Sequence, residues 1–79
     1  MMTLEILTPE WRREVADVEA VFLPGSMGSF EVLRNHAPLL STLAAGDIRW
    51  RLASGEESLA VRGGAVRVSD NLIQVCAEI

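Results

Sequence analysis

Few side chains of this 79-residue chain could carry out chemistry. His36 is the only histidine and Cys76 the only cysteine, so a metal cluster would have to be built almost entirely from carboxylates. Ser26 has two glycines nearby but no base in a recognisable nucleophile motif. We therefore expect no catalytic residue, no metal and no cofactor. We interpret His36 as a corner residue that bonds to backbone or contacts a partner.

The charged residues exclude several classes of function. All seven cations are arginines, and lysine is absent. Without lysine the chain cannot form a Schiff base or a Walker phosphate loop, and it cannot be a biotinyl or lipoyl carrier domain. The formal net charge of −4 argues against a nucleic-acid binder, because no basic stripe is present to neutralise phosphates.

The elements that would position any site are short strands. Apolar residues recur mainly at every second position, and turn residues such as Pro-Gly, Gly-Gly and Asp-Asn separate the runs roughly every 8 to 12 residues. This pattern predicts an all-β fold, either a sandwich or a barrel. We expect the strands at residues 3–7, 15–23, 30–33, 39–45, 47–52, 58–62, 66–69 and 73–75.

Alternation also assigns faces to the strands. Trp50 is expected in the core, and the run 15–23, apolar on both faces, is interpreted as one central or covered strand with Val18, Ala20 and Phe22 on one face. Cys76 alternates away from its inward neighbours but is expected to be a buried small hydrophobe. Four arginines fall on outward positions, where they either keep the protein soluble or form one basic face for an acidic partner: Arg49, Arg51, Arg62 and Arg67.

The segment 24–40 differs from the rest of the chain. It combines Pro24-Gly25, Gly28, Phe30 and the run Asn35-His36-Ala37-Pro38-Leu39-Leu40 within 17 residues. Glycine and proline at such points fix the backbone shape and supply no reactive group. The segment therefore indicates shaped, partly apolar loops that suit docking better than turnover.

This segment resembles the signature of the ATP synthase epsilon subunit family, in which Pro-Gly, Gly-x-Phe and Asn-His-Ala-Pro-Leu-Leu occur in this order. The run 4–9 is similar to the family's opening strand, and 61–78 to its closing hairpin, so the resemblance covers essentially the whole chain. The domain is also similar to the mitochondrial delta subunit. Two residues depart from the signature: Glu31 stands where glycine is usual, and Arg34 where proline is usual.

The resemblance implies a sandwich of two roughly five-stranded sheets that forms a single domain over residues 1–79. The family's C-terminal helical hairpin, which restrains ATP hydrolysis, is expected to be absent from this polypeptide. The resemblance further implies a non-catalytic rotor subunit that links the gamma subunit to the c-subunit ring. It would reach the catalytic alpha/beta assembly through gamma and couple proton or sodium flow to ATP synthesis.

The resemblance also suggests which residues contact each partner. The ring-facing loop corresponds to Ser26, Met27, Gly28, Ser29 and Phe30. The gamma-facing corner corresponds to His36, Ala37, Pro38 and Leu39, which could instead only shape the turn. The complex would hold the chain peripherally at the cytoplasmic face of a bacterial membrane. The alternative is a free-standing β-sandwich module that binds a sugar or peptide in a groove, with Trp50 as a stacking platform.

Overall fold

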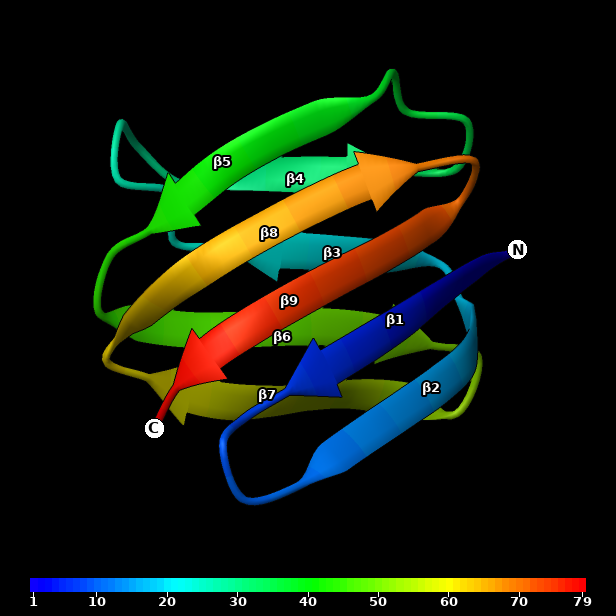
Figure 1. Cartoon of the computed structure of the whole chain (residues 1–79). Helices are drawn as coiled ribbons and strands as arrows, with labels where there is room; N and C mark the ends of the chain where they lie inside the picture. The colour runs from blue at the N-terminus through cyan, green and yellow to red at the C-terminus, as the bar shows by residue number, and fades with distance from the viewer.

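The computed structural model describes residues 1–79 and contains only strands, turns and loops (Figure 1). None of its elements is a helix of the length and apolarity needed to cross a membrane. The strands are β1 (Met2–Leu7), β2 (Arg12–Val18), β3 (Ala20–Leu23), β4 (Phe30–Leu33), β5 (Leu39–Leu43), β6 (Gly46–Leu52), β7 (Gly55–Val61), β8 (Gly63–Ser69) and β9 (Leu72–Glu78).

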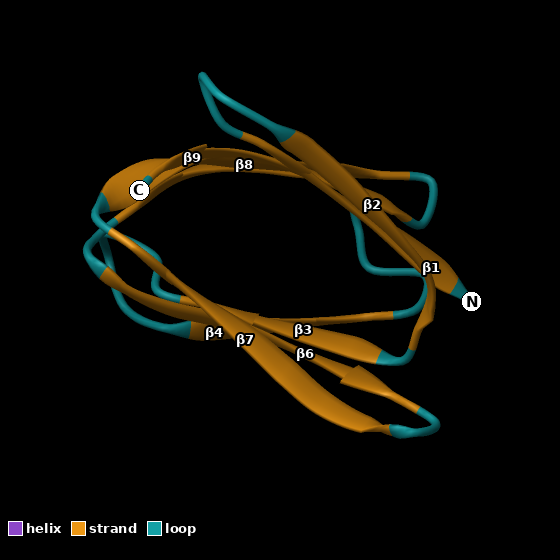
Figure 2. Ribbon diagram, turned by 90° about the horizontal axis from the view of Figure 1, so that it is seen from below, coloured by secondary structure: helices purple, strands orange, loops and turns teal.

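These strands form two sheets that pack face to face, as Figure 2 shows from the edge. The larger sheet has five strands in the order β2-β1-β9-β8-β5, and the smaller has four in the order β4-β3-β6-β7. All pairings are antiparallel except that of β1 with β9. The expected all-β sandwich is confirmed, with five and four strands instead of two sheets of about five.

Side chains from both sheets fill the space between them. The fully enclosed residues include Trp50 from the four-stranded sheet and Ile73 from the five-stranded sheet, each 0% exposed. Sixteen buried apolar residues form one continuous cluster, and no buried side chain is polar or charged. Because the core is entirely apolar, burial of hydrophobic surface dominates the stability of the sandwich.

The run 15–23, expected to be one strand, is divided between the two sheets. β2 ends at Val18 in the five-stranded sheet, and β3 begins at Ala20 in the other. Asp17 has a φ of 57°, and the β1–β2 register shifts beside it, so the chain bends here and crosses over. The expected common face was therefore wrong, because Val18 enters the core while Phe22 lies on the outer surface.

A polar contact closes the side of the sandwich where β2 faces β7. The indole Nε1–H of Trp50 donates to Glu57 Oε1 at 3.0 Å, and Arg13 donates to the same oxygen at 3.1 Å. The Arg13 guanidinium also lies over the Trp50 ring, 5.4 Å from its centroid. Glu57 thereby joins the two sheets.

Candidate interaction surfaces

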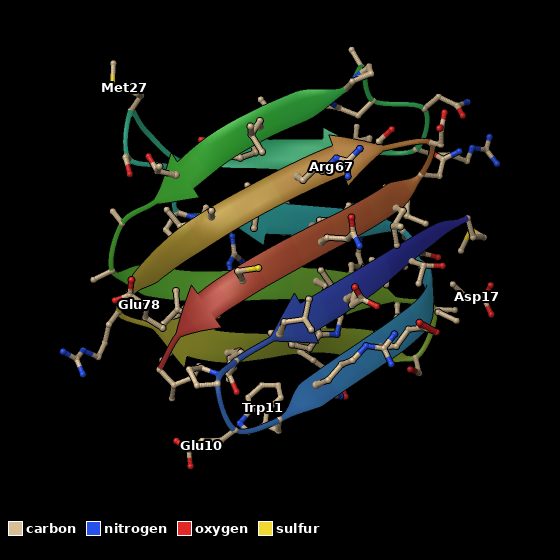
Figure 3. The ribbon with its side chains drawn as sticks, viewed as in Figure 1. Glu10, Trp11, Asp17, Met27, Arg67 and Glu78 are labelled. Carbon is tan, nitrogen blue, oxygen red and sulfur yellow. The ribbon has the colours of Figure 1, made fainter.

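The proposed ring-facing loop lies between β3 and β4. Met27 is 100% exposed and projects away from the sandwich at its tip (Figure 3). Phe30 turns inward and packs against the core cluster. The turn closes with a hydrogen bond from Gly28 N–H to Gly25 O at 3.0 Å. The loop therefore presents a fully exposed apolar side chain on a base closed by a hydrogen bond.

Only glycine fits at position 25, because the turn leaves no room there for a Cβ. A Cβ at Gly25 would lie 2.6 Å from the Gly28 carbonyl oxygen and 2.8 Å from the Phe30 ring. Both distances are shorter than real Cβ contacts, so any side chain here would push the turn open. The glycine of the Pro-Gly pair thus allows the loop to fold back tightly on Phe30.

The base of this loop is bonded to β5. Ser26 N–H donates to the Thr42 carbonyl at 3.0 Å, and the Thr42 hydroxyl donates to Ser26 Oγ at 2.9 Å. Ala44 N–H donates to Pro24 O at 2.8 Å, and Gly25 forms a bridge with Leu43. The loop is therefore held by both sheets, since Pro24 continues from the four-stranded sheet and β5 belongs to the five-stranded one.

The proposed gamma-facing corner follows β4. His36, Ala37 and Pro38 are exposed, and Leu39 is half-buried against the core. His36 N–H donates to Leu33 O at 3.1 Å, and Asn35 has a φ of 66°. The turn runs from Leu33 to His36, and a positive φ at only its third residue, Asn35, is the pattern of a type II turn. The His36 ring bonds the Ala37 carbonyl at 2.7 Å, so the interpretation of His36 as a backbone-bonding corner residue is confirmed.

The corner and the loop lie at opposite ends of β4, so the structure does not bring them together. In Figure 1 the loop lies at the left end of β4 and the corner at the right end, beyond the start of β5. The two sets of residues that the sequence suggested are therefore two separate surfaces, each available to a different partner.

A third surface, not identified from the sequence, lies on the outer face of the five-stranded sheet. Leu7 pairs with Cys76, and Cys76 pairs with Ala65 across the neighbouring strand. These side chains line an open groove of about 540 Å³. Cys76 is exposed here, so the expectation that it is buried was wrong. Outward apolar residues were the available signal, but their alignment depends on strand register, which the sequence left open.

The groove continues toward the corner. Leu40, 78% exposed, lines the adjoining hollow together with Leu7 and Cys76. A further hollow beside it is lined by Leu40, Leu39 and Pro38. Adjoining hollows therefore run from the corner across β5 and β8 to β1, and Arg67 and Gln74 lie among their apolar side chains.

Polar side chains of β1, β2 and β9 lie beside the groove. Arg12 donates to Glu5 Oε2 at 2.5 Å, and Gln74 Nε2 donates to Glu5 Oε1 at 3.2 Å. These hydrogen bonds, chiefly the one from Arg12, lower the pKa of the Glu5 carboxyl below its ordinary value of 4.5. Glu5 is therefore a fixed anion at neutral pH, at one border of the apolar surface.

The arginines do not form one basic face. Arg67 projects from β8 on the outer face of the five-stranded sheet (Figure 3), whereas Arg49 and Arg51 lie on the outer face of the other sheet. Arg49 stacks on the Phe22 ring at 4.7 Å. Acidic side chains lie beside both, Glu56 at 3.5 Å from Arg49 and Glu19 at 3.8 Å from Arg51. The hypothesis of one basic sheet face was wrong.

No group of three histidine, cysteine, aspartate or glutamate side chains lies close enough to bind a metal ion. Trp50 is fully buried and cannot stack on a sugar from solvent, which removes the main support for the alternative of a sugar-binding module. The fold and its surfaces define a small β-sandwich with two shaped loops and a groove on its five-stranded sheet.

Comparison with known proteins identifies the family. All of residues 1–79 match the family described as "ATP synthase, Delta/Epsilon chain, beta-sandwich domain", and the chain belongs to this family. It is 40% identical over 76 residues to the ATP synthase epsilon chain of Desulfitobacterium hafniense, covering 96% of this chain and 58% of that protein. It is 41% identical over 80 residues to the epsilon chain of Symbiobacterium thermophilum, covering 98% and 56%. The chain thus spans less than two thirds of these relatives.

Solved structures agree on the fold. A chain of the Tetrahymena thermophila mitochondrial ATP synthase central stalk and c-ring matches with a TM-score of 0.84 at 16% identity, covering 99% of this chain and 63% of that one. A chain of the Euglena gracilis mitochondrial ATP synthase, in a structure of OSCP, F1 and the c-ring, also gives 0.84 at 18% identity, covering 96% and 49%. The expected epsilon-type sandwich is therefore confirmed.

Proposed function

We propose that this chain is a non-catalytic subunit of the central stalk of an F-type ATP synthase, linking the gamma subunit to the c-subunit ring. It passes rotation of the ring, driven by proton or sodium flow, to gamma and hence to the catalytic alpha/beta assembly. In a bacterium this function corresponds to a peripheral position at the cytoplasmic face of the membrane. The family assignment supports membership of the complex, and the surfaces support the individual contacts.

The observation that carries this proposal is the series of adjoining hollows from the corner to the groove, in which Leu40 and Cys76 are exposed beside Arg67. Leu40 at 78% exposure and the exposed Cys76 are costly to leave in water, and a protein partner that covers them gains their burial free energy. The surface includes Pro38 and Leu39 of the corner. We assign it to gamma, because a partner seated on the sheet would contact His36 and Ala37 as well.

The loop at the other end of β4 is assigned to the ring. Met27 is fully exposed at its tip, and the loop base is bonded to both sheets through Ser26 and Pro24. A tip that touches the moving ring must transmit displacement to the rest of the domain without unfolding. An anchored base with one flexible apolar side chain at the tip meets both requirements.

Charge substitutions with a matched control test the gamma surface. Ala65→Arg places a cation in the groove and Ala37→Arg places one at the corner, while Ala60→Arg adds the same charge at an exposed position of β7 on the other sheet. We expect at least tenfold weaker binding to gamma for the first two variants and wild-type binding for the third, with all three folded by circular dichroism. Equal affinity of all three variants for gamma would refute this assignment.

The ring contact is tested in the reconstituted complex. Met27→Glu should loosen coupling between ATP hydrolysis and proton pumping, because it brings a charge to the tip, whereas Ser54→Glu in the exposed β6–β7 turn should leave pumping intact. Unaltered pumping per ATP in the Met27 variant would count against the tip assignment.

A further inference from the structure

Two asparagine side chains join the corner to the hairpin turn between β8 and β9. Asn71 Oδ1 accepts the backbone N–H of Asn35 at 2.7 Å, and Asn71 Nδ2 donates to Asn35 Oδ1 at 3.2 Å. A backbone N–H can only donate, so one orientation of the Asn71 amide satisfies both bonds. The corner leaves the four-stranded sheet, whereas Asn71 belongs to the other sheet, so this pair spans the sandwich.

Asn71 itself is held firmly in place. Asp70 and Asn71 have φ values of 52° and 62°, the pattern of a two-residue type I′ hairpin turn. The Asn71 carbonyl also accepts the N–H of Thr3 at 3.0 Å, which fixes the turn against β1. The side-chain amide therefore projects toward the corner from a turn that three strands stabilise.

The corner depends on this pair. The other hydrogen bonds of residues 34–38 are local: His36 N–H to Leu33 O, and the His36 ring to Ala37 O. Every hydrogen bond between this segment and the rest of the molecule beyond β4 is made with Asn71. Since residues 34–38 are all exposed, packing holds them only weakly.

We propose that Asn71 is a positioning residue for the gamma-facing corner. Its amide fixes Asn35, and through the turn it presents the backbone of 36–38 in the arrangement that gamma binds. This inference rests on the proposed function, but it does not require Asn71 to touch gamma. A corner released from Asn71 samples other conformations and must be ordered again on binding, which weakens affinity.

Three variants separate positioning from turn stability. Asn71→Gly removes both side-chain bonds and keeps a residue that adopts the positive φ of this turn. Asp70→Gly is the matched control, because Asp70 has a similar φ but makes no hydrogen bond to the corner. Asn71→Asp keeps an oxygen that accepts the Asn35 N–H, so it should retain part of the wild-type affinity for gamma.

The experiment measures gamma affinity by titration and the amide hydrogen exchange of Asn35 by NMR. We expect Asn71→Gly to bind gamma about tenfold more weakly, equivalent to about 1.4 kcal/mol, and to exchange the Asn35 amide at least tenfold faster. Asp70→Gly should match the wild type in both measurements, and Asn71→Asp should lie in between. Asn71→Gly behaving like Asp70→Gly in affinity would overturn the proposal.

The two measurements, gamma affinity and Asn35 amide exchange, also distinguish failure of this inference from failure of the proposed function. If the wild-type chain does not bind gamma, the proposed function fails, and exchange alone then decides whether Asn71 holds the corner. In that case, equal Asn35 exchange rates in Asn71→Gly and Asp70→Gly would overturn the positioning role as well.

Discussion

Gly64→Ala offers the sharpest test of how tightly the five-stranded sheet is built. Gly64 lies on β8 with a φ of 146°, and a Cβ added there would lie 2.2 Å from the Cys76 carbonyl oxygen and 3.2 Å from the Ala77 Cα on β9. Both contacts are with backbone, which cannot rotate away as a side chain can. The β8–β9 ladder would have to separate locally to admit a methyl group.

The magnitude follows from two costs. An L-residue forced into this φ region costs about 2 kcal/mol, and overpacking against a backbone adds about 2 kcal/mol more. For a 79-residue domain the entropy of unfolding is about 0.17 kcal/mol per kelvin, so about 4 kcal/mol lowers Tm by roughly 24 °C. This loss is a large fraction of the total stability expected for a domain of this size.

Gly28→Ala is the control that isolates the contact. Gly28 has a φ of 129° but no atom within 4 Å of its added Cβ, so it carries only the conformational cost, about 2 kcal/mol or roughly 12 °C. Thermal unfolding followed by circular dichroism measures both variants. If the two melt within a few degrees of each other, the close approach of β8 to β9 at Gly64 is not what limits this position.

Three further predictions concern single contacts. Glu57→Ala should lower the free energy of unfolding in urea by about 1–2 kcal/mol, because the indole N–H of Trp50 loses its acceptor, whereas Glu57→Gln keeps an acceptor and should lose less. Arg34→Pro should raise Tm by a few degrees, since Arg34 occupies the second position of a type II turn and its N–H bonds nothing; a lower Tm would contradict that turn. The depressed pKa of Glu5 contributes stability that is present above its ordinary value of 4.5 and is lost as pH falls through the lower, folded-state value. Urea unfolding from pH 7 to 3 should therefore show a smaller acid loss in Glu5→Gln than in the wild type, and identical pH profiles would contradict this role.

The second half of the fold could be predicted from the sequence because its signals agree with one another. Strict alternation around Trp50 and Ile73 gave the correct inward faces, and the Asp70-Asn71 turn was correctly expected. Each of β6 to β9 is seven residues long, and two short turns join them in pairs as the hairpins β6–β7 and β8–β9. In such hairpins, period and turn chemistry together determine the structure.

The first half could not be predicted in the same way. Alternation through 15–23 continues across the bend at Asp17, so it does not reveal that the chain changes sheets after Val18. A period of two reports that residues alternate, but it does not report which sheet receives them. The crossover depends on a positive φ and a register shift, which aspartate allows but does not dictate.

The candidate surfaces also differ in whether the sequence could predict them. Loop shape was readable from Pro24-Gly25 and from the His-Ala-Pro run, because glycine and proline act locally. The groove was not readable, since it exists only when Leu7, Cys76 and Ala65 align across three strands. Whether the loop meets the ring and the corner meets gamma stays a prediction that the binding experiments test.

The bonds between the base of the loop and β5 have a mechanical consequence. From Pro24 the chain runs through the tip, along β4, around the corner and back along β5, where Thr42 and Ala44 bond to Ser26 and Pro24. Together these hydrogen bonds close about twenty residues of backbone into a loop, with the tip at one end and the corner at the other. A force applied to the tip therefore reaches the corner through both β4 and β5.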